Sequence, residues 1–396
     1  MKRLFAAALW AGALVAAPAM AQVALKPDTP NLLFWSPEQQ ARWYPAMETV
    51  YETRPIASGA RIHALPQATG KIDPSFTHAG RTWTVDQYME AYRVSGLLVI
   101  QDGHVLLEKY GLGRGPKDRW TSFSVAKSMT ATLVGAAIQD GHIKSLKTPV
   151  TDILPELKGS AYEGVTLRQL LMMSSGVRWN EDYADPNSDV AKGPLEGLKL
   201  AEGKPGLNPV VAYMRTLPRA HAPGTKFNYN TGETDLVGIL LARAVGKGLA
   251  EYASEKIWKP YGMEAEGVWV TDPGGLERGG CCMSMTLRDY GRIGQFVLDE
   301  GVIDGRPVLP PGWAREATTK QIENGGQAGY GYFWWMQPNG AYQASGIFGQ
   351  SITTYREDRI IIVVNSAWPK SGGPDLRDGR TALVNALREA ARARPK

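Results

Sequence analysis

The chain has few of the residues that build metal and redox sites. Its 396 residues include two cysteines, adjacent at Cys281-Cys282, and five scattered histidines. No H-E-x-x-H motif and no C-x-x-C pair occurs, so a zinc site has no support. Neighbouring cysteines rarely bridge because the geometry is strained. We therefore expect the pair to act as small buried hydrophobic residues, with a catalytic cysteine as the less favoured alternative.

Several other functional signatures are also missing. No G-x-S-x-G occurs, which argues against the nucleophile elbow of an α/β-hydrolase, and no glycine-rich phosphate loop precedes a helix. The net charge of +5 is mild, and its densest basic cluster, residues 377–396, fits the solvated face of a terminal helix. We therefore expect no nucleic-acid partner. Beyond the N-terminal segment, no run reaches the roughly 18 apolar residues that a membrane helix needs.

The N-terminal segment has the pattern of a secretory signal peptide. Lys2-Arg3 precede an apolar, alanine-rich run that ends at Pro18, and Ala19-Met20-Ala21 is a small-x-small cleavage site. This pattern predicts cleavage after Ala21 and a periplasmic or secreted mature protein. The sequence leaves the oligomeric state open.

The remaining chain divides into an arm and a folded domain. Residues 22–90 are rich in Pro, Trp and Tyr and weakly periodic, so we interpret them as an N-terminal arm with a short helix at 83–92. Residues 91–392 form the domain, with a helical subdomain at roughly 145–300. Period-2 and period-3.6 patterns predict strands at 96–100, 105–110, 329–335, 344–355 and 358–368, and helices at 124–138, 167–173, 231–245, 286–299 and 375–394.

This order of elements predicts the fold class. Strands lie at both ends of the domain and helices lie between them, which indicates an α+β fold: an antiparallel sheet flanked by helices, with an all-α domain packed beside it. A turn at 101–104 joins the first two strands as a hairpin, and Thr166 is the expected N-cap of its helix. Residues 179–207 form a long polar connection of the kind that serves as a lid or binding loop.

The most informative motif is Ser124-Val125-Ala126-Lys127, at the start of an apolar helix. A spacing of three places the two side chains one turn apart on one helix face. A serine hydroxyl is a weak nucleophile until a base takes its proton. Lowering the lysine pKa from about 10.4 to about 7–8 costs roughly 4 kcal/mol, and burial at a helix N-terminus favours that shift. Ser124 and Lys127 are therefore a candidate nucleophile and base, although a surface Ser and Lys is the commoner explanation of S-x-x-K alone.

Two further segments add to this pair. Tyr229 lies in a turn before the helix at 231–245, where it can relay a proton or simply be a half-buried tyrosine. Gly346 and Gly349 flank Ile347, so the backbone there can approach a ligand closely or form a β-bulge. A backbone N–H from this segment and the N–H of Ser124 can together form an oxyanion hole.

Taken together, these segments resemble the penicillin-recognising serine hydrolases, related to class C β-lactamases. The S-x-x-K, a Y-x-N-like turn about 100 residues later and a K-T-G-like strand near the C-terminus carry the resemblance, with VTLRQLLMMSSG at 165–176 and GGCCMSMTLRD at 279–289. It covers roughly residues 90 to 390. GIFGQ at 346–350 and DYADPNSD at 182–189 resemble the 6-aminohexanoate-dimer hydrolase branch. The resemblance implies a serine β-lactamase/DD-peptidase-like fold.

The resemblance also implies an activity and a set of roles. It implies a serine hydrolase that cleaves an amide or ester bond of a small molecule through an acyl-enzyme, with no metal or organic cofactor. Ser124 attacks, Lys127 accepts its proton as a neutral amine or through Tyr229, Tyr229 protonates the leaving group, and Ile347 supplies the second oxyanion N–H. A loop tyrosine, Tyr183, closes over the substrate. The implied substrate contacts are Tyr183, Asp189, Thr231, Ser345, Gly346 and Gln350.

Two departures from the family pattern bear on the substrate. Thr231 stands where class C β-lactamases have Asn, and Ala344 stands where they have the Lys that helps to hold a substrate carboxylate. β-Lactam hydrolysis and DD-peptidase activity are therefore not expected as the main activity. An amidase, a short-chain carboxylesterase and a non-catalytic binding or sensor module of the same fold stay open as alternatives.

Overall fold

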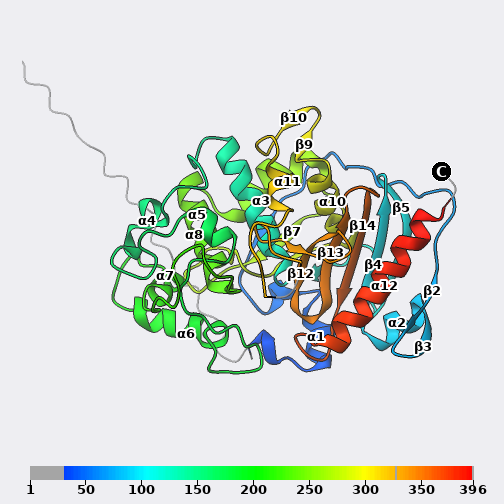
Figure 1. Ribbon diagram of the computed structural model, residues 1–396, viewed down its shortest axis with the longest axis horizontal. Helices are drawn as coiled ribbons and strands as arrows, with labels where there is room; N and C mark the ends of the chain where they lie inside the picture. Colours follow the sequence, from blue (N-terminus) through cyan, green and yellow to red (C-terminus); the bar gives the residue numbers. More distant parts are fainter. Residues whose placement is uncertain (1–30, 326–327, 395–396) are drawn as a thin grey trace, which may run out of the picture.

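The computed structural model describes residues 31–325 and 328–394, so the predicted signal peptide lies outside the described residues. Its central element is a six-stranded antiparallel sheet in the order β11-β12-β13-β14-β4-β5 (Figure 1). The strands are β4 Val94–Gln101, β5 His104–Tyr110, β11 Trp335–Met336, β12 Tyr342–Gly346, β13 Gln350–Tyr355 and β14 Ile360–Ser366. Strand β4 pairs with β14, so the sheet joins the two ends of the domain. This confirms the predicted α+β arrangement.

Helices cover both faces of this sheet. They are α3 Val125–Gln139 and α10 Leu287–Leu298 on one face, and α12 Pro374–Arg392, which crosses the other face in Figure 1. Side chains alternate between faces along a strand, and β14 follows this rule. Ile361 and Val363 belong to the core with α3 and α10, whereas Ile360 and Ile362 belong to the core with α12. A strand buried on both faces needs this unbroken apolar run.

The helical region lies to one side of the sheet (Figure 1). It contains α4 Val150–Ile153, α5 Leu167–Leu171, α6 Asp189–Ala201, α7 Pro209–Met214, α8 Thr231–Val245, α9 Leu249–Ala253 and a π-helix at Ser254–Gly262. Thr166 caps α5 in a reciprocal capping box with Gln169, as the sequence predicts. Helix α8 has the predicted bounds. It begins at an Asn230 cap and ends at Gly246, whose φ of 70° suits a glycine.

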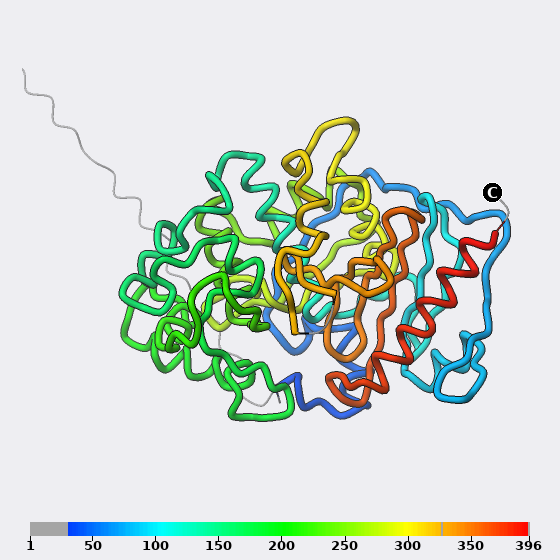
Figure 2. Tube along the Cα trace, in the orientation of Figure 1, coloured from blue at the N-terminus to red at the C-terminus, as the bar shows by residue number. Residues whose placement is uncertain are grey.

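A second sheet, which the sequence patterns did not predict, links the arm to the middle of the chain. Its order is β1-β7-β8-β6, formed by β1 Thr53–Ile56, β7 Gly267–Val270, β8 Met283–Met285 and β6 Trp120–Thr121. The arm also carries α1 Pro37–Trp43, the hairpin of β2 Ser75–His78 and β3 Arg81–Thr84, and α2 Val85–Ala91, which confirms the expected short helix at 83–92. Figure 2 shows the arm passing around the molecule to this hairpin, far from the helical region.

Three predicted elements differ from the structure. The connection at 179–207 contains α6. Its Gly193 and Gly197 do not mark a loop; they let α6 pack closely against α7. A methyl group at Gly197 would lie 2.3 Å from the carbonyl oxygen of Pro209 at the start of α7. The strand predicted at 344–355 is two strands, β12 and β13, because Phe348 and Gly349 turn the chain with φ of 58° and 95°. The strand predicted at 329–335 reduces to β11, because Phe333 has a φ of 60°.

The smaller remaining elements lie beside the sheets. They are the hairpin of β9 Val302–Ile303 and β10 Arg306–Pro307, and α11 Trp313–Ala317. Within the described part of the chain, no helix combines the length and the apolar character needed to cross a membrane.

Candidate active site

Ser124 lies at the N-terminus of α3, where β6 ends. The residue before it, Phe123, has a φ of 43°, a conformation that side chains other than glycine adopt only when the surroundings enforce it. The surroundings here include two hydrogen bonds between Ser122 and Met283 of β8, at 2.7 and 3.0 Å. The second sheet therefore holds the turn that presents Ser124, a residue that is 9% exposed.

Lys127 is buried one helical turn from Ser124 and has three acceptors. Its Nζ lies 3.2 Å from Ser124 Oγ, 2.9 Å from Thr231 Oγ1 and 2.7 Å from the carbonyl oxygen of Gly280. The side chain is 1% exposed. Burial disfavours the charged ammonium and lowers the pKa of Lys127 to about 8, against the opposing attraction of Glu181 and other nearby carboxylates. A neutral amine is thus accessible near neutral pH.

The Gly280 carbonyl reaches Lys127 because glycine brings its segment against α8. A methyl group at Gly280 would lie 2.9 Å from both the Thr231 carbonyl oxygen and its Cγ2, closer than real Cβ contacts allow. Asp235, one turn along α8 from Thr231, accepts the Gly280 N–H at 2.8 Å and pairs with Arg278 at 3.0 Å. Sequence reasoning did not identify Asp235, because a single carboxylate inside an apolar helix matches no motif.

Tyr229 completes a compact group with the two S-x-x-K residues. The Lys127 Nζ lies 5.3 Å from the centre of the Tyr229 ring, and the nearby Ser124 side chain opposes in part the effect of burial on the pKa of Tyr229. Its ring packs against Trp335 with 5.2 Å between centroids. Burial raises the pKa of Tyr229 well above its usual range, so the phenol stays protonated and is available as a proton donor. The structure therefore brings together the three residues predicted to carry the reaction.

The turn after β12 places Ile347 beside Ser124, and both residues line the same cavity. Close approach here depends on Gly346, where a methyl group would lie 2.6 Å from the Ser122 carbonyl oxygen and 3.1 Å from the Ser124 nitrogen. The Phe123 and Phe348 rings, which flank the two turns, pack 5.1 Å apart. Backbone N–H groups from two braced turns are the usual construction of an oxyanion hole.

Tyr44 of the arm supports both of these turns. Its ring lies 5.1 Å from that of Phe123 and 6.0 Å from that of Phe348. Its carbonyl oxygen accepts the Thr121 N–H at 3.0 Å, and its side chain is fully buried. The arm is therefore part of the support of the site rather than a separate appendage.

Glu181 is a site residue that sequence reasoning missed. Its carboxylate accepts hydrogen bonds from the Trp179 indole, from the Tyr183 hydroxyl at 2.6 Å, and from both the backbone N–H, at 2.9 Å, and the hydroxyl of Thr231. No motif marks it, because a glutamate in a polar connection is ordinarily solvated. The one sequence feature that pointed to this segment was the nearby Tyr183, which the family resemblance did identify.

The predicted substrate contacts fall into two groups. Tyr183, Asp189 and Thr231 line the cavity. Both carboxylate oxygens of Asp189 already accept hydrogen bonds, from the Asn180 N–H at 2.7 Å and from the Tyr213 hydroxyl at 2.5 Å. Asp189 therefore joins the 179–188 segment to α6 and α7.

The remaining predicted contacts, Ser345, Gly346 and Gln350, lie on β12 and β13. None of these three lines the cavity, although the neighbouring Ile347 does. Ser345 pairs with Ser351 in the sheet. Gln350 is fully buried, and its amide bonds the carbonyl oxygens of Phe348, at 3.2 Å, and Ser366, at 2.7 Å. The structure thus gives Gln350 a bracing position under the Ile347 turn instead of a surface that meets a substrate.

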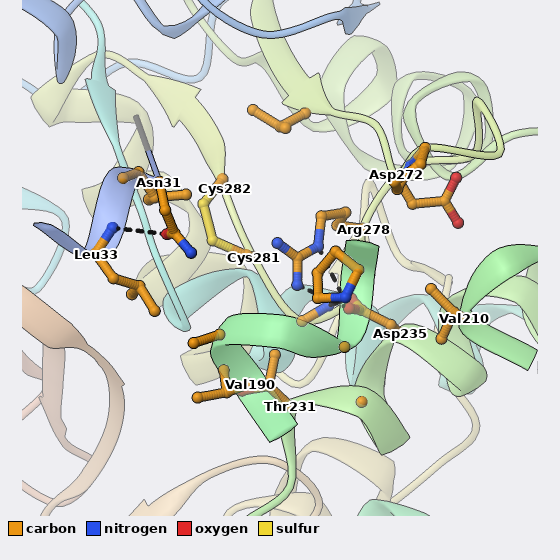
Figure 3. Close-up of a pocket in the computed structure, with 18 of the residues that line it drawn as sticks. Asn31, Leu33, Val190, Val210, Thr231, Asp235, Asp272, Arg278, Cys281 and Cys282 are labelled. Carbon is orange, nitrogen blue, oxygen red and sulfur yellow. Dashed lines mark hydrogen bonds and ion pairs between the residues drawn. A yellow bond between two sulfur atoms is a disulfide. The ribbon is translucent and has the colours of Figure 1, made fainter. Parts of the chain in front are cut away.

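The cavity in front of Ser124 has a volume of about 570 Å³. Aliphatic and aromatic side chains from the arm, α6 and α7 form most of its wall, and Arg278 is paired with Asp235 at one side (Figure 3). Cys281 and Cys282 also line it, and they are joined by a disulfide that Figure 3 draws in yellow. The expectation of two separate buried thiols was wrong: the pair is buried but bridged. Cys282 has a φ of 72°, a backbone state that sequence pattern does not reveal.

No group of three or more potential ligands among His, Cys, Asp and Glu is arranged to hold a metal ion in residues 31–325 and 328–394.

Comparison with known proteins agrees with the motifs. The β-lactamase family model matches residues 83–386. The chain belongs to the β-lactamase family. A 6-aminohexanoate-dimer hydrolase from Paenarthrobacter ureafaciens is 30% identical over 92% of this chain and 94% of its own. Among solved structures, a candidate 6-aminohexanoate-dimer hydrolase from Bacillus anthracis has a TM-score of 0.80 at 22% identity, over 90% of this chain and 95% of that one.

A further solved structure with a similar fold belongs to an esterase. A family VIII carboxylesterase aligns with a TM-score of 0.57 at 16% identity, over 78% of this chain and 94% of that one, which is a likeness of fold. The predicted family, its 6-aminohexanoate-dimer hydrolase branch and the α+β fold are confirmed, and the family's hydrolase chemistry applies to this chain in general terms. The choice between amide and ester stays a prediction.

Both departures from the β-lactamase pattern are visible in the site. Thr231 is the first residue of α8 and accepts from Lys127, so the position retains a polar atom. Ala344 is fully buried in β12 and brings no charge. The cation that lines the cavity, Arg278, is paired with Asp235, which leaves it poorly suited to hold a substrate carboxylate.

Proposed function

We propose that the protein is a serine hydrolase that cleaves amide bonds of small substrates through an acyl-enzyme. The observation that carries this proposal is the Lys127 amine, buried and 3.2 Å from the Ser124 hydroxyl. Lowering the lysine pKa to about 8 gives a base matched to neutral pH. A surface Ser and Lys would have neither the burial nor this contact.

The proposed reaction begins with proton transfer from Ser124 Oγ to Lys127 Nζ. As Oγ bonds the carbonyl carbon, the negative charge on the carbonyl oxygen is stabilised by the N–H groups of Ser124 and Ile347. The leaving amine or alcohol takes the phenol proton of Tyr229, and the Lys127 ammonium replaces that proton. Water then attacks the acyl-enzyme along the reverse proton path. Lys127 serves as the base here, because burial keeps the Tyr229 phenol protonated.

The cavity favours a linear, mainly apolar substrate. About 570 Å³ lies in the range of small-molecule sites, and its wall is largely aliphatic and aromatic. A 6-aminohexanoate dimer, the substrate named for the P. ureafaciens relative, has two five-carbon chains around one amide, and these chains suit such a wall. Its ammonium and carboxylate lie at the far ends of the two chains, away from the scissile bond. The uncharged Ala344 position argues against β-lactams and peptide C-termini as main substrates, because their carboxylate lies one carbon from the nitrogen of the scissile amide, whereas the carboxylate of the dimer lies five carbons from it.

A short-chain carboxylesterase is the second candidate. The likeness to a family VIII carboxylesterase and the protonated Tyr229 both allow an alcohol as the leaving group. A non-catalytic binding module is less well supported, because binding alone does not require a buried lysine in contact with the Ser124 hydroxyl. We also propose a periplasmic or secreted location, with which the disulfide of Cys281 and Cys282 is compatible.

The test compares kcat/KM for a linear 6-aminohexanoate dimer and for p-nitrophenyl acetate in the wild type and in Ser124→Ala. We expect both activities in the wild type and neither in the variant, with the melting temperature little changed. Turnover only of the ester would favour the carboxylesterase. Equal turnover by Ser124→Ala would overturn the proposal.

A further inference from the structure

Glu181 collects an unusual set of donors for a residue in a polar connection. Its Oε1 accepts from the Tyr183 hydroxyl and from the Thr231 hydroxyl, and its Oε2 accepts from the Trp179 indole and from the Thr231 backbone N–H. A carboxylate can only accept. The single hydroxyl hydrogen of Thr231 is therefore committed to Glu181.

This commitment determines how Lys127 uses its own hydrogen atoms. The Gly280 carbonyl can only accept, and Thr231 Oγ1, with its hydrogen on Glu181, can also only accept from Lys127. A neutral amine has two N–H groups and one lone pair. With both N–H groups donated to these two acceptors, the lone pair is left for the third neighbour, Ser124 Oγ at 3.2 Å.

We propose that Glu181 is a positioning residue, which directs the lone pair of Lys127 to Ser124 through the Thr231 hydroxyl. The inference rests on the proposed function. Without the carboxylate, the Thr231 hydroxyl can rotate and donate to Nζ, which occupies the lone pair that should take the Ser124 proton. In the productive arrangement, the Ser124 O–H bond breaks, an N–H bond to Lys127 forms, and the new ammonium keeps its donors on Gly280 and Thr231.

Glu181 also acts on Lys127 through its charge, and this gives the test its signature. Burial lowers the pKa of Lys127 most; Glu181 and Asp235 raise it, and Arg278 lowers it. The neutral phenol of Tyr229 faces the same amine. Removing the Glu181 charge should therefore move the acid limb of the rate to lower pH, while loss of orientation lowers the plateau.

The experiment measures the second-order rate constant for labelling of Ser124 by a fluorophosphonate between pH 5.5 and 10. This rate reports the nucleophile without a known substrate. The variants are Glu181→Gln and the matched control Asp182→Asn, an exposed carboxylate in the same segment whose Oδ1 accepts the Ala184 N–H. We expect the plateau labelling rate of Glu181→Gln to fall at least about 10-fold and the rising, acidic part of its pH–rate profile to move to lower pH. Asp182→Asn should match the wild type in both.

A double-mutant cycle tests whether the effect passes through Thr231. The Glu181→Gln substitution should lower the labelling rate much less in the Thr231→Val background than in the wild type, because the hydroxyl that Glu181 orients is already gone. Thr231→Ser, which keeps a hydroxyl, should label within a few-fold of the wild type. This pair keeps the inference testable even if Glu181→Gln folds poorly.

The outcomes separate this inference from the proposed function. A folded wild type that is not labelled at Ser124 would overturn both. A labelled wild type with an equal rate and limb in Glu181→Gln would overturn only the inference. Glu181 would have a purely structural role if its variant lowered the plateau rate without moving the pH profile, and if its effect were additive with that of Thr231→Val. Equal labelling rates of Thr231→Ser and Thr231→Val would lead to the same conclusion.

Discussion

At the scale of single residues, the site depends on how burial changes two ordinary side chains. Lys127 and Tyr229 lie within contact distance of one another, and burial affects them in opposite senses. It disfavours the charged amine, which lowers the pKa of Lys127, and it disfavours the phenolate, which raises the pKa of Tyr229. One group becomes a base near neutral pH and the other remains an acid.

The pH dependence of the rate should therefore follow Lys127. Because the base is the neutral amine, kcat/KM should rise with pH and level off above a midpoint of about 8. Lys127→Arg keeps the positive charge but cannot release its proton, so it should lose about 10²–10⁴-fold at every pH. A wild-type profile that is flat from pH 6 to 9 would contradict this role of Lys127.

The role of Tyr229 should depend on the leaving group. An amine must be protonated as it leaves, whereas p-nitrophenolate leaves without a proton. Tyr229→Phe should therefore reduce amide hydrolysis by about 10²-fold or more and p-nitrophenyl acetate hydrolysis much less. Parallel kinetic measurements on both substrates check this prediction, and an equal loss on the two would assign Tyr229 a role other than proton donor.

At the scale of elements, close approach of backbones positions the site. Gly280 brings its segment to α8, and Gly346 brings β12 to the Ser124 turn. Among the 44 glycines of the sequence, these two lie in segments that carry the family resemblance, 279–289 and 346–350. The family motif marked Gly346, but its role in close packing follows only from the three-dimensional contacts.

Gly346→Ala should damage the oxyanion hole while leaving the fold. Its methyl group would meet the Ser122 carbonyl oxygen at 2.6 Å, which pushes the Ile347 turn away from Ser124. Loss of one oxyanion donor costs about 10²–10³-fold in kcat. Gly115→Ala is the matched control, because its methyl group meets only Asp118 Oδ2 at an ordinary 3.5 Å. Wild-type kcat in Gly346→Ala would contradict the assignment of this turn.

Helix α8 also carries a buried acid that should affect stability. Glu233 is 1% exposed, and burial raises its pKa from an ordinary 4.5 to about 8, although it accepts from Ser175 and Tyr162. The folded state therefore holds the proton more tightly than the unfolded chain. The stability contributed by this proton is fully present below about pH 4.5 and is lost as pH rises to about 8.

Glu233→Gln removes this titration but keeps an acceptor for Ser175. As the pH rises from 4.5 to 9, the difference in free energy of unfolding between this variant and the wild type should shift by about 1 kcal/mol or more in favour of the variant. Denaturant unfolding at several pH values measures the difference, with the exposed Glu251→Gln of α9 as a control. Parallel stability curves for Glu233→Gln and the wild type would show that the buried acid is not the cause.

At the scale of the whole molecule, the site forms where three separate parts of the chain meet. The Ser124 turn comes from the second sheet, Tyr229 and Thr231 come from the helical region, and Ile347 comes from the large sheet. The spacing of Ser124 and Lys127 and the resemblance to a known family predicted these residues. Apolar periodicity predicted α8 and α12, and the order of elements predicted one sheet from early and late strands. Longer-range contacts were not predictable, because the places of Glu181 and Tyr44 depend on which segments the folded chain brings together. The bridge between the adjacent Cys281 and Cys282 was missed for a local reason, because the left-handed backbone at Cys282, with a φ of 72°, leaves no sequence pattern.

The central claim is that Ser124 is an acyl-transfer nucleophile activated by Lys127. Its most direct test is to treat the folded protein with a fluorophosphonate and map the adduct by mass spectrometry, with Lys127→Arg as the comparison. The account predicts one label per chain, on Ser124, with labelling greatly slowed in the variant. A folded protein that takes no label, or takes it at a residue other than Ser124, would contradict the account.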